Sequence, residues 1–544
     1  MSAPRLLAAF LMTVLASPTA APGQNSPKKN TERLGTVHFA TSCNSPAQKE
    51  FNRSVALLHS FQFSDAIDGF NATLKSDPTC AIADWGIALS DWSNPFAAAT
   101  KDPTQLQAGR AASQTGLAAN PKTDRERAYL TAVANLYTNF ETTPQQSRLV
   151  AYRDAMKDLA VKYPDDHEAQ IFYALSLAAS ADPADQTYAA RLQAGAILEK
   201  LFAEEPTHPG LAHYLIHTYD VPSLAPRALE AARRYSEIAP DAPHALHMPS
   251  HTFTRTGDWS ASISSNIAAA AAAKREGQTA EELHCSDYLV YAYLQTGQDQ
   301  AARQVLTSLP EIESRFDPEK IISGAGGPAA AYFALAAIPA RYALERQKWN
   351  EAARLDPRET PFPYADAITW FARGVGAARL VRTRPAYEAV NALTQIREKL
   401  WLAGETYWAR QVEIQQFEVA AWAALAATKP DEALAQMKTA AEMEDATDKS
   451  AITPGPLAPA RELLGEMYLQ LNQPAEALQQ FEATLTKEPR RFRALYGAAY
   501  AAQLSANPAA SQKYFRELLK VCDHPDTPPR PELTAAQAAT TPQN

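Results

Sequence analysis

A 34-residue register that recurs along the chain is the sequence feature that most limits what this protein can fold into. Its clearest copy runs from Arg461 to Pro489. There, small residues at Gly465 and Ala477 are combined with large ones at Tyr468 and Phe481. Small residues at such positions let two antiparallel helices approach closely, and large ones fill the space between them. One helical hairpin cannot bury its own apolar face, so the pattern predicts a stack of hairpins.

The same frame returns at both ends and in the middle of the chain. Well-marked units begin near residues 47, 81, 209, 243 and 283, and the last step is longer by six inserted residues. Less regular hairpins are predicted at 123–162, 167–203, 333–355, 365–400 and 407–444. The spacing therefore predicts eleven or twelve hairpins, and no alternating strand pattern competes with them.

This register resembles the tetratricopeptide repeat (TPR). The resemblance implies an all-α fold, a TPR-like α-solenoid in which stacked antiparallel helix hairpins form a superhelix with one concave groove. We expect the solenoid to span residues 37–522. The polar segment 24–36 and the tail 523–544, which is rich in Pro, Thr, Ala and Gln, are predicted to be disordered.

The N-terminus has the pattern of a secretory signal peptide. Arg5 precedes an apolar run over residues 6–16, and small residues and prolines follow. We predict a signal peptide over residues 1–23, cleaved after Gly23. The apolar run is too short to span a bilayer and no other stretch is longer, so we expect no integral membrane span. The mature protein is expected to be exported, either periplasmic or secreted.

Composition and charge are those of a globular protein and not of a nucleic-acid-binding one. Hydrophobic residues make up 46% of the 544 residues, which is enough for a packed core. The chain has 51 Lys and Arg against 60 Asp and Glu, a formal charge of −9, and no long basic run. We therefore expect no nucleic acid as partner.

Several longer strings are similar to those of a bacterial family of exported TPR proteins. They are SCNSPAQ, DPTCAIADWGIAL, HPGLAHYLIHTYD, PHALHMPSH, IPARYALERQKW and TPGPLAPARELLGEM. The resemblance covers about residues 36–520. It implies the fold and carries no assigned reaction.

Histidines are concentrated in the central repeats. Seven of the eleven histidines lie within the 77 residues from His208 to His284. His213 and His217 are four residues apart, so they share one helical face. The pair recurs 34 residues later as His247 and His251, in the equivalent place of the next repeat.

The resemblance to TPR proteins implies that these side chains face the concave groove. Paired imidazoles with further nitrogen or carboxylate donors are typical of sites for Zn, Cu, Fe or Mn. The predicted metal ligands are His213, His217, His244, His247, His251, His284 and Asp287. We expect the two i,i+4 pairs to share one ion, with the other three residues as further ligands or supporting partners. Asp220 and Arg255 lie one turn beyond two of the histidines and are expected to orient the ligands.

Two other interpretations of the cluster remain open. The histidines can be a structural feature copied with the repeat, or they can line a groove that holds a protein or peptide ligand. For that groove we predict Trp85, Trp92, His59, Arg255 and Arg341. The sequence contains no GxSxG, HExxH or paired Cys/His motif, so no catalytic residue is nominated. The resulting prediction is an exported TPR protein that binds a peptide or other ligand in its groove, and the alternative is a metalloprotein or metal-dependent enzyme.

The four cysteines predict one disulfide. Cys43 and Cys80 precede the first helices of consecutive repeats, so stacking should bring their backbones into the range that a disulfide needs. Cys285 is expected to be a core thiol.

Overall fold

The computed structural model describes residues 32–97, 101–319 and 326–541. The predicted signal peptide lies outside these residues, as do residues 24–31 of the predicted segment 24–36. The chain divides into a unit that ends at Glu32 and a second unit that begins at Arg33. Everything below concerns the second unit.

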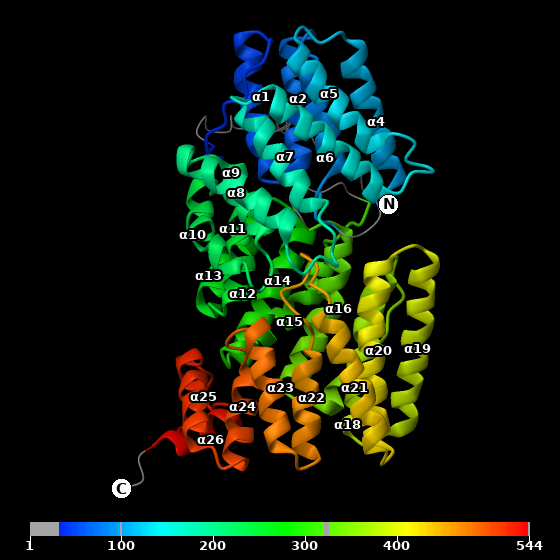
Figure 1. The fold of residues 1–544 in the computed structure, drawn as a ribbon, viewed down its shortest axis with the longest axis vertical. Coiled ribbons are helices and arrows are strands. Elements are labelled where there is room, and N and C mark those ends of the chain that lie inside the picture. Colours follow the sequence, from blue (N-terminus) through cyan, green and yellow to red (C-terminus); the bar gives the residue numbers. More distant parts are fainter. Residues whose placement is uncertain (1–31, 98–100, 320–325, 542–544) are drawn as a thin grey trace, which may run out of the picture. The chain divides into compact units, whose positions relative to one another are not determined.

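The described residues form helices joined by short turns, without strands (Figure 1). The N-terminal half contains α1 Ser45–His59, α2 Phe63–Ser76, α3 Ile82–Trp92, α4 Pro103–Ala118, α5 Asp124–Ala134, η1 Asn135–Tyr137, α6 Gln145–Lys162, α7 His167–Ala179, α8 Ala189–Glu204, α9 Pro209–Thr218, η2 Ala225–Ala228, α10 Leu229–Ile238, α11 Pro243–His247, α12 Pro249–Thr256 and α13 Trp259–Arg275. The C-terminal half contains α14 Thr279–Gln295, α15 Asp299–Glu313, α16 Pro328–Glu345, α17 Trp349–Ala352, α18 Pro363–Arg379, α19 Thr383–Leu402, α20 Thr406–Ala426, α21 Pro430–Asp445, α22 Ala460–Gln470, α23 Pro474–Lys487, α24 Phe492–Leu504, α25 Pro508–Val521 and α26 Pro531–Thr540.

These helices form antiparallel hairpins that pack in the order of the sequence, so the fold is the expected all-α, TPR-like solenoid. The small-and-large pattern of the repeat explains the close packing. The ring of Phe481 on α23 lies between Gly465 on α22 and Gly497 on α24. A Cβ atom at these two glycines would lie 2.9 Å and 2.4 Å from that ring, so only glycine fits.

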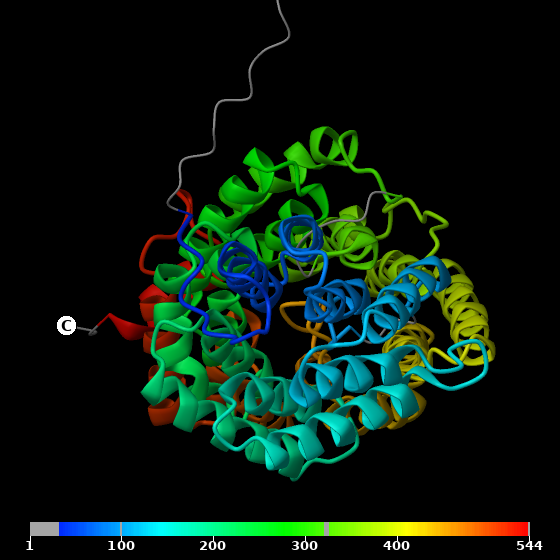
Figure 2. The ribbon, with the colours of Figure 1, turned by 90° about the horizontal axis from the view of Figure 1, so that it is seen from above.

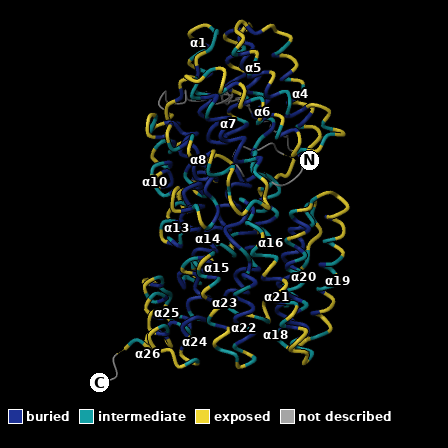
Figure 3. The backbone as a smooth tube through the Cα atoms, in the orientation of Figure 1, coloured by how far each residue is buried: buried dark blue, intermediate teal, exposed yellow. Residues whose placement is uncertain are grey.

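Helices far apart in the sequence also meet, because the stack coils (Figure 2). Helix α1 contacts α9, and α14 contacts α24. Gln278 Nε2 donates to Gln62 Oε1 at 2.9 Å, and Trp259 Nε1 donates to the carbonyl oxygen of Arg490 at 3.0 Å. The inner faces of the helices are consequently buried, and exposure is concentrated on the outer faces (Figure 3).

A loop between α21 and α22 passes through the middle of the coil. We call residues 446–459 the axial loop; it is drawn in orange in Figures 1 and 2. Its Lys449 Nζ lies 3.0 Å from Asp220 Oδ2, and its Gly455 carbonyl accepts a hydrogen bond from Arg341 Nη2 at 3.0 Å. The axial loop therefore bridges the central repeats from inside.

The solenoid extends beyond both boundaries expected for it. Helix α26 packs on α25, with Leu533 1% exposed, and Arg530 pairs with Asp299. Leu533 and Ala536 lie on one helical face in a segment that otherwise reads as polar, so the expectation of a disordered tail from 523 is wrong for this helix. At the other end, Leu34 is buried and Thr36 donates its backbone N–H to the Thr207 carbonyl, so this part of 24–36 is ordered.

Among the described residues, no helix combines the length and apolarity needed to cross a membrane.

Candidate metal centre

Six of the predicted metal ligands meet in one buried cluster. They come from α9, α11, α12 and α14, and each is 3% exposed or less. They divide into a first trio, His213, His217 and His244, and a second trio, His247, His251 and His284. Within each trio, one nitrogen from every ring lies within 4.8 Å of the others.

In the first trio, the three Nε2 atoms have no hydrogen-bond partner among the described residues. The opposite ring nitrogens of two members are held in place. His213 Nδ1 donates to the carbonyl oxygen of His59 at 2.6 Å, and His244 Nδ1 lies 2.9 Å from Glu281 Oε1. A carbonyl and an ionised carboxylate can only accept, so both Nδ1 atoms carry the proton and both Nε2 atoms present a lone pair.

A buried lone pair without a hydrogen-bond donor costs free energy of folding, because the atom has lost its hydrogen bond to water and has gained no other. An imidazole with its N–H fixed by an acceptor and its other nitrogen free is the arrangement of a metal-bound histidine. The first trio therefore has the chemistry of a three-nitrogen metal site.

The second trio is oriented in the same way. His247 Nδ1 lies 2.7 Å from Asn266 Oδ1, while Asn266 Nδ2 donates to the Ser262 carbonyl and so fixes which way the amide faces. His251 Nδ1 lies 3.0 Å from Asp220 Oδ2. Both rings thus carry their proton on Nδ1, and their Nε2 atoms lie 3.1 Å apart. His284 completes the trio, with its ring centroid 4.5 Å from that of His247.

The two trios are contiguous. The ring centroids of His217 and His251 are 5.8 Å apart, and those of His244 and His247 are 5.9 Å apart. The cluster can therefore hold two ions in adjacent sites, as two-metal centres do.

Burial favours the neutral form of five of the six imidazoles, the form that binds metal. Burial lowers the pKa values of His213, His217 and His247 well below the ordinary range, and neighbouring histidines lower them further. Burial also lowers the pKa of His284 to about 3, although Glu281 opposes the shift.

The carboxylates that support the cluster are ionised. Burial by itself would raise the pKa of Asp220, but Lys449, Arg255 and His251 outweigh it and hold the pKa well below the usual range. The pKa of Glu281 is likewise lowered to about 2, because His244 and His284 overcome the effect of burial. The expected orienting partners Asp220 and Arg255 are in contact, with Arg255 Nε 3.0 Å from Asp220 Oδ1.

The structure groups the predicted ligands differently in two respects. The two i,i+4 pairs do not share one four-nitrogen site, because the first pair groups with His244 and the second pair groups with His284. Asp287 does not join either trio. Its Oδ1 accepts from Arg341 Nε at 2.7 Å, which uses the carboxylate in an ion pair.

The residues predicted to line an open groove are buried instead. The side chains in question are Trp85, Trp92, His59, Arg255 and Arg341, none more than 3% exposed. The coil brings later repeats and the axial loop against this face, so Arg341 bonds to Thr453 and Gly455 and Arg255 lies 3.7 Å from Glu488. An isolated repeat would expose these positions, and the complete coil covers them.

A third group, the carboxylate trio, was not predicted. Glu168 Oε2 lies 2.9 Å from His59 Nε2, and its Oε1 lies 3.0 Å from His208 Nε2. His208 is the N-cap residue of α9, and its ring lies within hydrogen-bond distance of Glu168. In this trio both histidines have a hydrogen-bond contact with the one carboxylate, so Glu168 bridges the two rings.

A cavity of about 1110 Å³ adjoins the first trio. Its lining includes His217, Asp220, Trp92 and Lys101, and the axial loop contributes residues 447–451. One member of the cluster, His217, therefore lies at the wall of a cavity large enough for a small molecule.

Sequence reasoning missed Glu168, Asn266, Glu281 and Lys449. Their partners lie 19 to 229 residues away. The sequence offers one indication of such residues, a polar side chain on an otherwise apolar helix face, as at Glu281 and Asn266. This indication does not identify the histidine that the side chain contacts.

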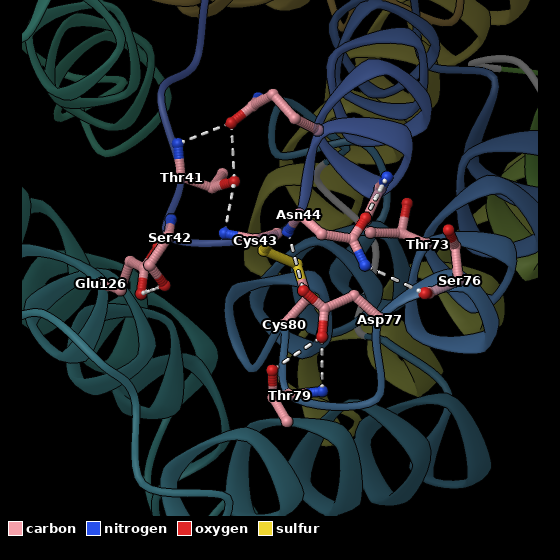
Figure 4. The surroundings of a disulfide bond; sticks show 12 residues. Thr41, Ser42, Cys43, Asn44, Thr73, Ser76, Asp77, Thr79, Cys80 and Glu126 are labelled. Carbon is pink, nitrogen blue, oxygen red and sulfur yellow. Dashed lines mark hydrogen bonds between the residues drawn. A yellow bond between two sulfur atoms is a disulfide. The ribbon is translucent and has the colours of Figure 1, made fainter.

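Cys43 and Cys80 form a disulfide with a Cα–Cα distance of 5.0 Å (Figure 4). Asn44 and Asp77 brace it, since the Asn44 N–H donates to Asp77 Oδ2 at 2.8 Å. Cys285 is a buried thiol whose Sγ lies 3.6 Å from His247 Nδ1, beside the second trio and not within it.

A scan against protein-family models finds no match, and neither does a search of the curated proteins. Among solved structures, the chain is similar to human IFIT1 bound to m7Gppp-AAAA, with 10% identity, a TM-score of 0.37, and coverage of 88% of this chain and 96% of that one. It is also similar to yeast Tom70, with 11% identity, a TM-score of 0.32, and coverage of 91% and 95%.

Proposed function

We propose that this protein is a TPR-like metalloprotein that binds two transition-metal ions, one in each histidine trio. The observation that carries the proposal is the set of three buried Nε2 atoms in the first trio that lack any hydrogen-bond partner among the described residues. The close approach of the His247 and His251 Nε2 atoms extends the proposal to the second trio.

The donor set narrows the choice of metal. Each trio offers imidazole nitrogens and no carboxylate oxygen, a set that suits Zn, Cu and Fe better than Mn. Cu and Zn stand highest in the general order of affinity for such ligands. We therefore propose Cu or Zn, with the ionised Asp220 and Glu281 balancing part of the added positive charge.

The test is the metal content of full-length protein purified without a histidine tag, measured by inductively coupled plasma mass spectrometry. We expect close to two equivalents of Cu or Zn, either as purified or after reconstitution at micromolar metal and neutral pH. Fewer than about 0.2 equivalents of Zn, Cu and Fe under both conditions would overturn the proposal.

A peptide or protein ligand in the groove is the other function that the TPR-like fold allows. The residues predicted for this groove are buried. The axial loop bonds to Arg341, which is one of them, and to Asp220, which is the partner of Arg255. No contact among the described residues favours that function over metal binding.

We also infer that the protein is exported to the periplasm or secreted. The signal-peptide pattern of residues 1–23 supports this inference, and so does the disulfide between Cys43 and Cys80, a bond typical of oxidising compartments. N-terminal mass spectrometry of protein from the exporting cell should find Gln24 as the first residue, and an intact N-terminus in cytosolic protein would contradict it.

A further inference from the structure

The cavity beside the first trio contains a second feature that metal binding does not use. Two cations flank the ring of Trp92: Lys101 Nζ lies 5.7 Å from the ring centroid and the Arg148 guanidinium carbon lies 5.2 Å from it. All three side chains line the cavity, and each is 8% exposed or less.

Neither cation has a carboxylate partner. In the described residues, no Asp or Glu oxygen lies within 4.0 Å of Lys101 Nζ or of the Arg148 guanidinium nitrogens. Lys101 Nζ donates to the Asn94 carbonyl at 2.7 Å and approaches Ser93 Oγ at 3.3 Å, and Arg148 donates to the carbonyls of Leu136 and Thr143. Burying an ion costs free energy unless an opposite charge compensates it, so two buried cations near one ring favour an anion as the ligand of this cavity.

Trp92 supplies an independent sign of a ligand. Its indole Nε1 is buried and has no hydrogen-bond partner among the described residues. An indole N–H can only donate, so it calls for an acceptor. Burial also lowers the pKa of Lys101 to about 7, a shift that an anion nearby would reverse.

Three carboxylates of the cavity lining already have partners. Asp220 is held by Arg255 and Lys449, and Glu141 by Arg110. Asp448 accepts from the Tyr188 hydroxyl at 3.3 Å. None of these three carboxylates forms an ion pair with Lys101 or Arg148.

We propose that this cavity binds a small organic anion, whose carboxylate or phosphate group is held by Lys101, Arg148 and the Trp92 N–H. The ring of Phe96 also lines the cavity and stacks on His217 at a centroid distance of 4.5 Å. The anion's apolar body would lie between these groups and His217, next to the first trio. The anion site stands on its own contacts and does not require that a metal be bound.

The experiment is titration calorimetry of the full-length, chelator-treated protein with three probes of one shape: benzoate, phenyl phosphate and benzyl alcohol. We expect at least one anion to bind and the neutral alcohol to bind at least tenfold more weakly. The anion that binds better identifies the head group. Equal binding of the alcohol, or no binding of either anion at millimolar concentration, would overturn the proposal.

Two variants locate the site. Lys101→Met removes a cation, and Trp92→Phe keeps a ring but removes the N–H; each should weaken anion binding at least tenfold. Lys162→Met, which changes an exposed lysine on the same helix as Arg148, is the control and should bind normally. Unchanged affinity in both cavity variants would overturn the proposal. If either variant fails to fold, the comparison of the three probes on wild type still decides it.

Failure of the anion site and failure of the metal centre are distinguishable. Metal content is read on untreated protein, and anion binding is read after chelation.

Discussion

The Nε2 atoms of His247 and His251 face each other at 3.1 Å, although each ring already carries its proton on Nδ1. Two lone pairs at that distance repel unless a proton or a cation lies between them. Burial opposes the proton, because it lowers the pKa values of both rings. Two nitrogens about 2.0–2.1 Å from one metal ion at an angle of about 90–110° are roughly 2.8–3.4 Å apart. The observed separation is therefore that of two ligands of one ion.

Single replacements should separate the two metal sites. His217 and His284 make no side-chain hydrogen bond among the described residues, so His217→Ala and His284→Ala remove a proposed ligand and its ring packing without leaving a hydrogen-bond partner unpaired. Each should lower the metal content from about two equivalents to about one while helical circular dichroism is retained. His167→Ala, outside the cluster, is the control. Two equivalents in both cluster variants would contradict the assignment of one ion to each trio.

Asn266 should control metal affinity without touching the metal. Asn266→Leu removes the acceptor that keeps the His247 proton on Nδ1, so we expect metal affinity to fall 10–100-fold. Asn266→Asp retains an acceptor and should bind metal close to wild type. Competition with a chromogenic chelator measures both variants, and equal losses in the two would argue against a role for the acceptor.

The disulfide should stabilise the first hairpins. Closing a loop of 37 residues contributes about 3–4 kcal/mol in the chain-entropy model. Cys43→Ser should lower the free energy of unfolding by about that amount, whereas Cys522→Ser, which changes a free cysteine, should not show the loop-closure loss. Thiol titration of unfolded, unreduced protein should find two reactive thiols, and four would rule out the bond.

Glu418 should make stability depend on pH. Burial raises the pKa of Glu418 well above its ordinary value, and the neighbouring Glu444 adds to the shift. The folded protein therefore keeps a proton that the unfolded chain releases above a pH of about 4.3, so this carboxyl stabilises the fold less as pH rises.

Glu418→Gln removes that dependence. Its free energy of unfolding, relative to wild type, should rise by up to about 1.4 kcal/mol per pH unit between pH 5 and the folded pKa. Urea unfolding at pH 5.0 and 7.5 measures the difference. Glu442→Gln, an exposed change on α21, should show no such trend. A relative stability that stays constant between the two pH values would refute the prediction.

The positions of the hairpins could be predicted from the sequence because each hairpin is formed by contacts within its own repeat and with the adjacent repeats. Gly465, Ala477 and Phe481 lie within one repeat, and the contacts they make are local. The same reasoning located the histidines, since the 34-residue register places His213 and His247 in equivalent positions on stacked helices. It failed at α26, where a short apolar face is hidden in a polar segment.

The grouping of the histidines and their burial were decided by the tertiary structure. His244 groups with the pair on α9, whereas His247 and His251 group with His284 on α14, so the ligands form two trios where the register suggests one set. Coiling of the stack then covers Trp85, Arg255 and Arg341, which a single repeat would leave open. The sequence by itself determined which residue types recur at which register, because that depends on contacts within and between adjacent repeats. Which groups from distant repeats meet, such as Lys449 with Asp220, depends on the summed rotation of all the hairpins between them, and only the complete coil fixes that sum.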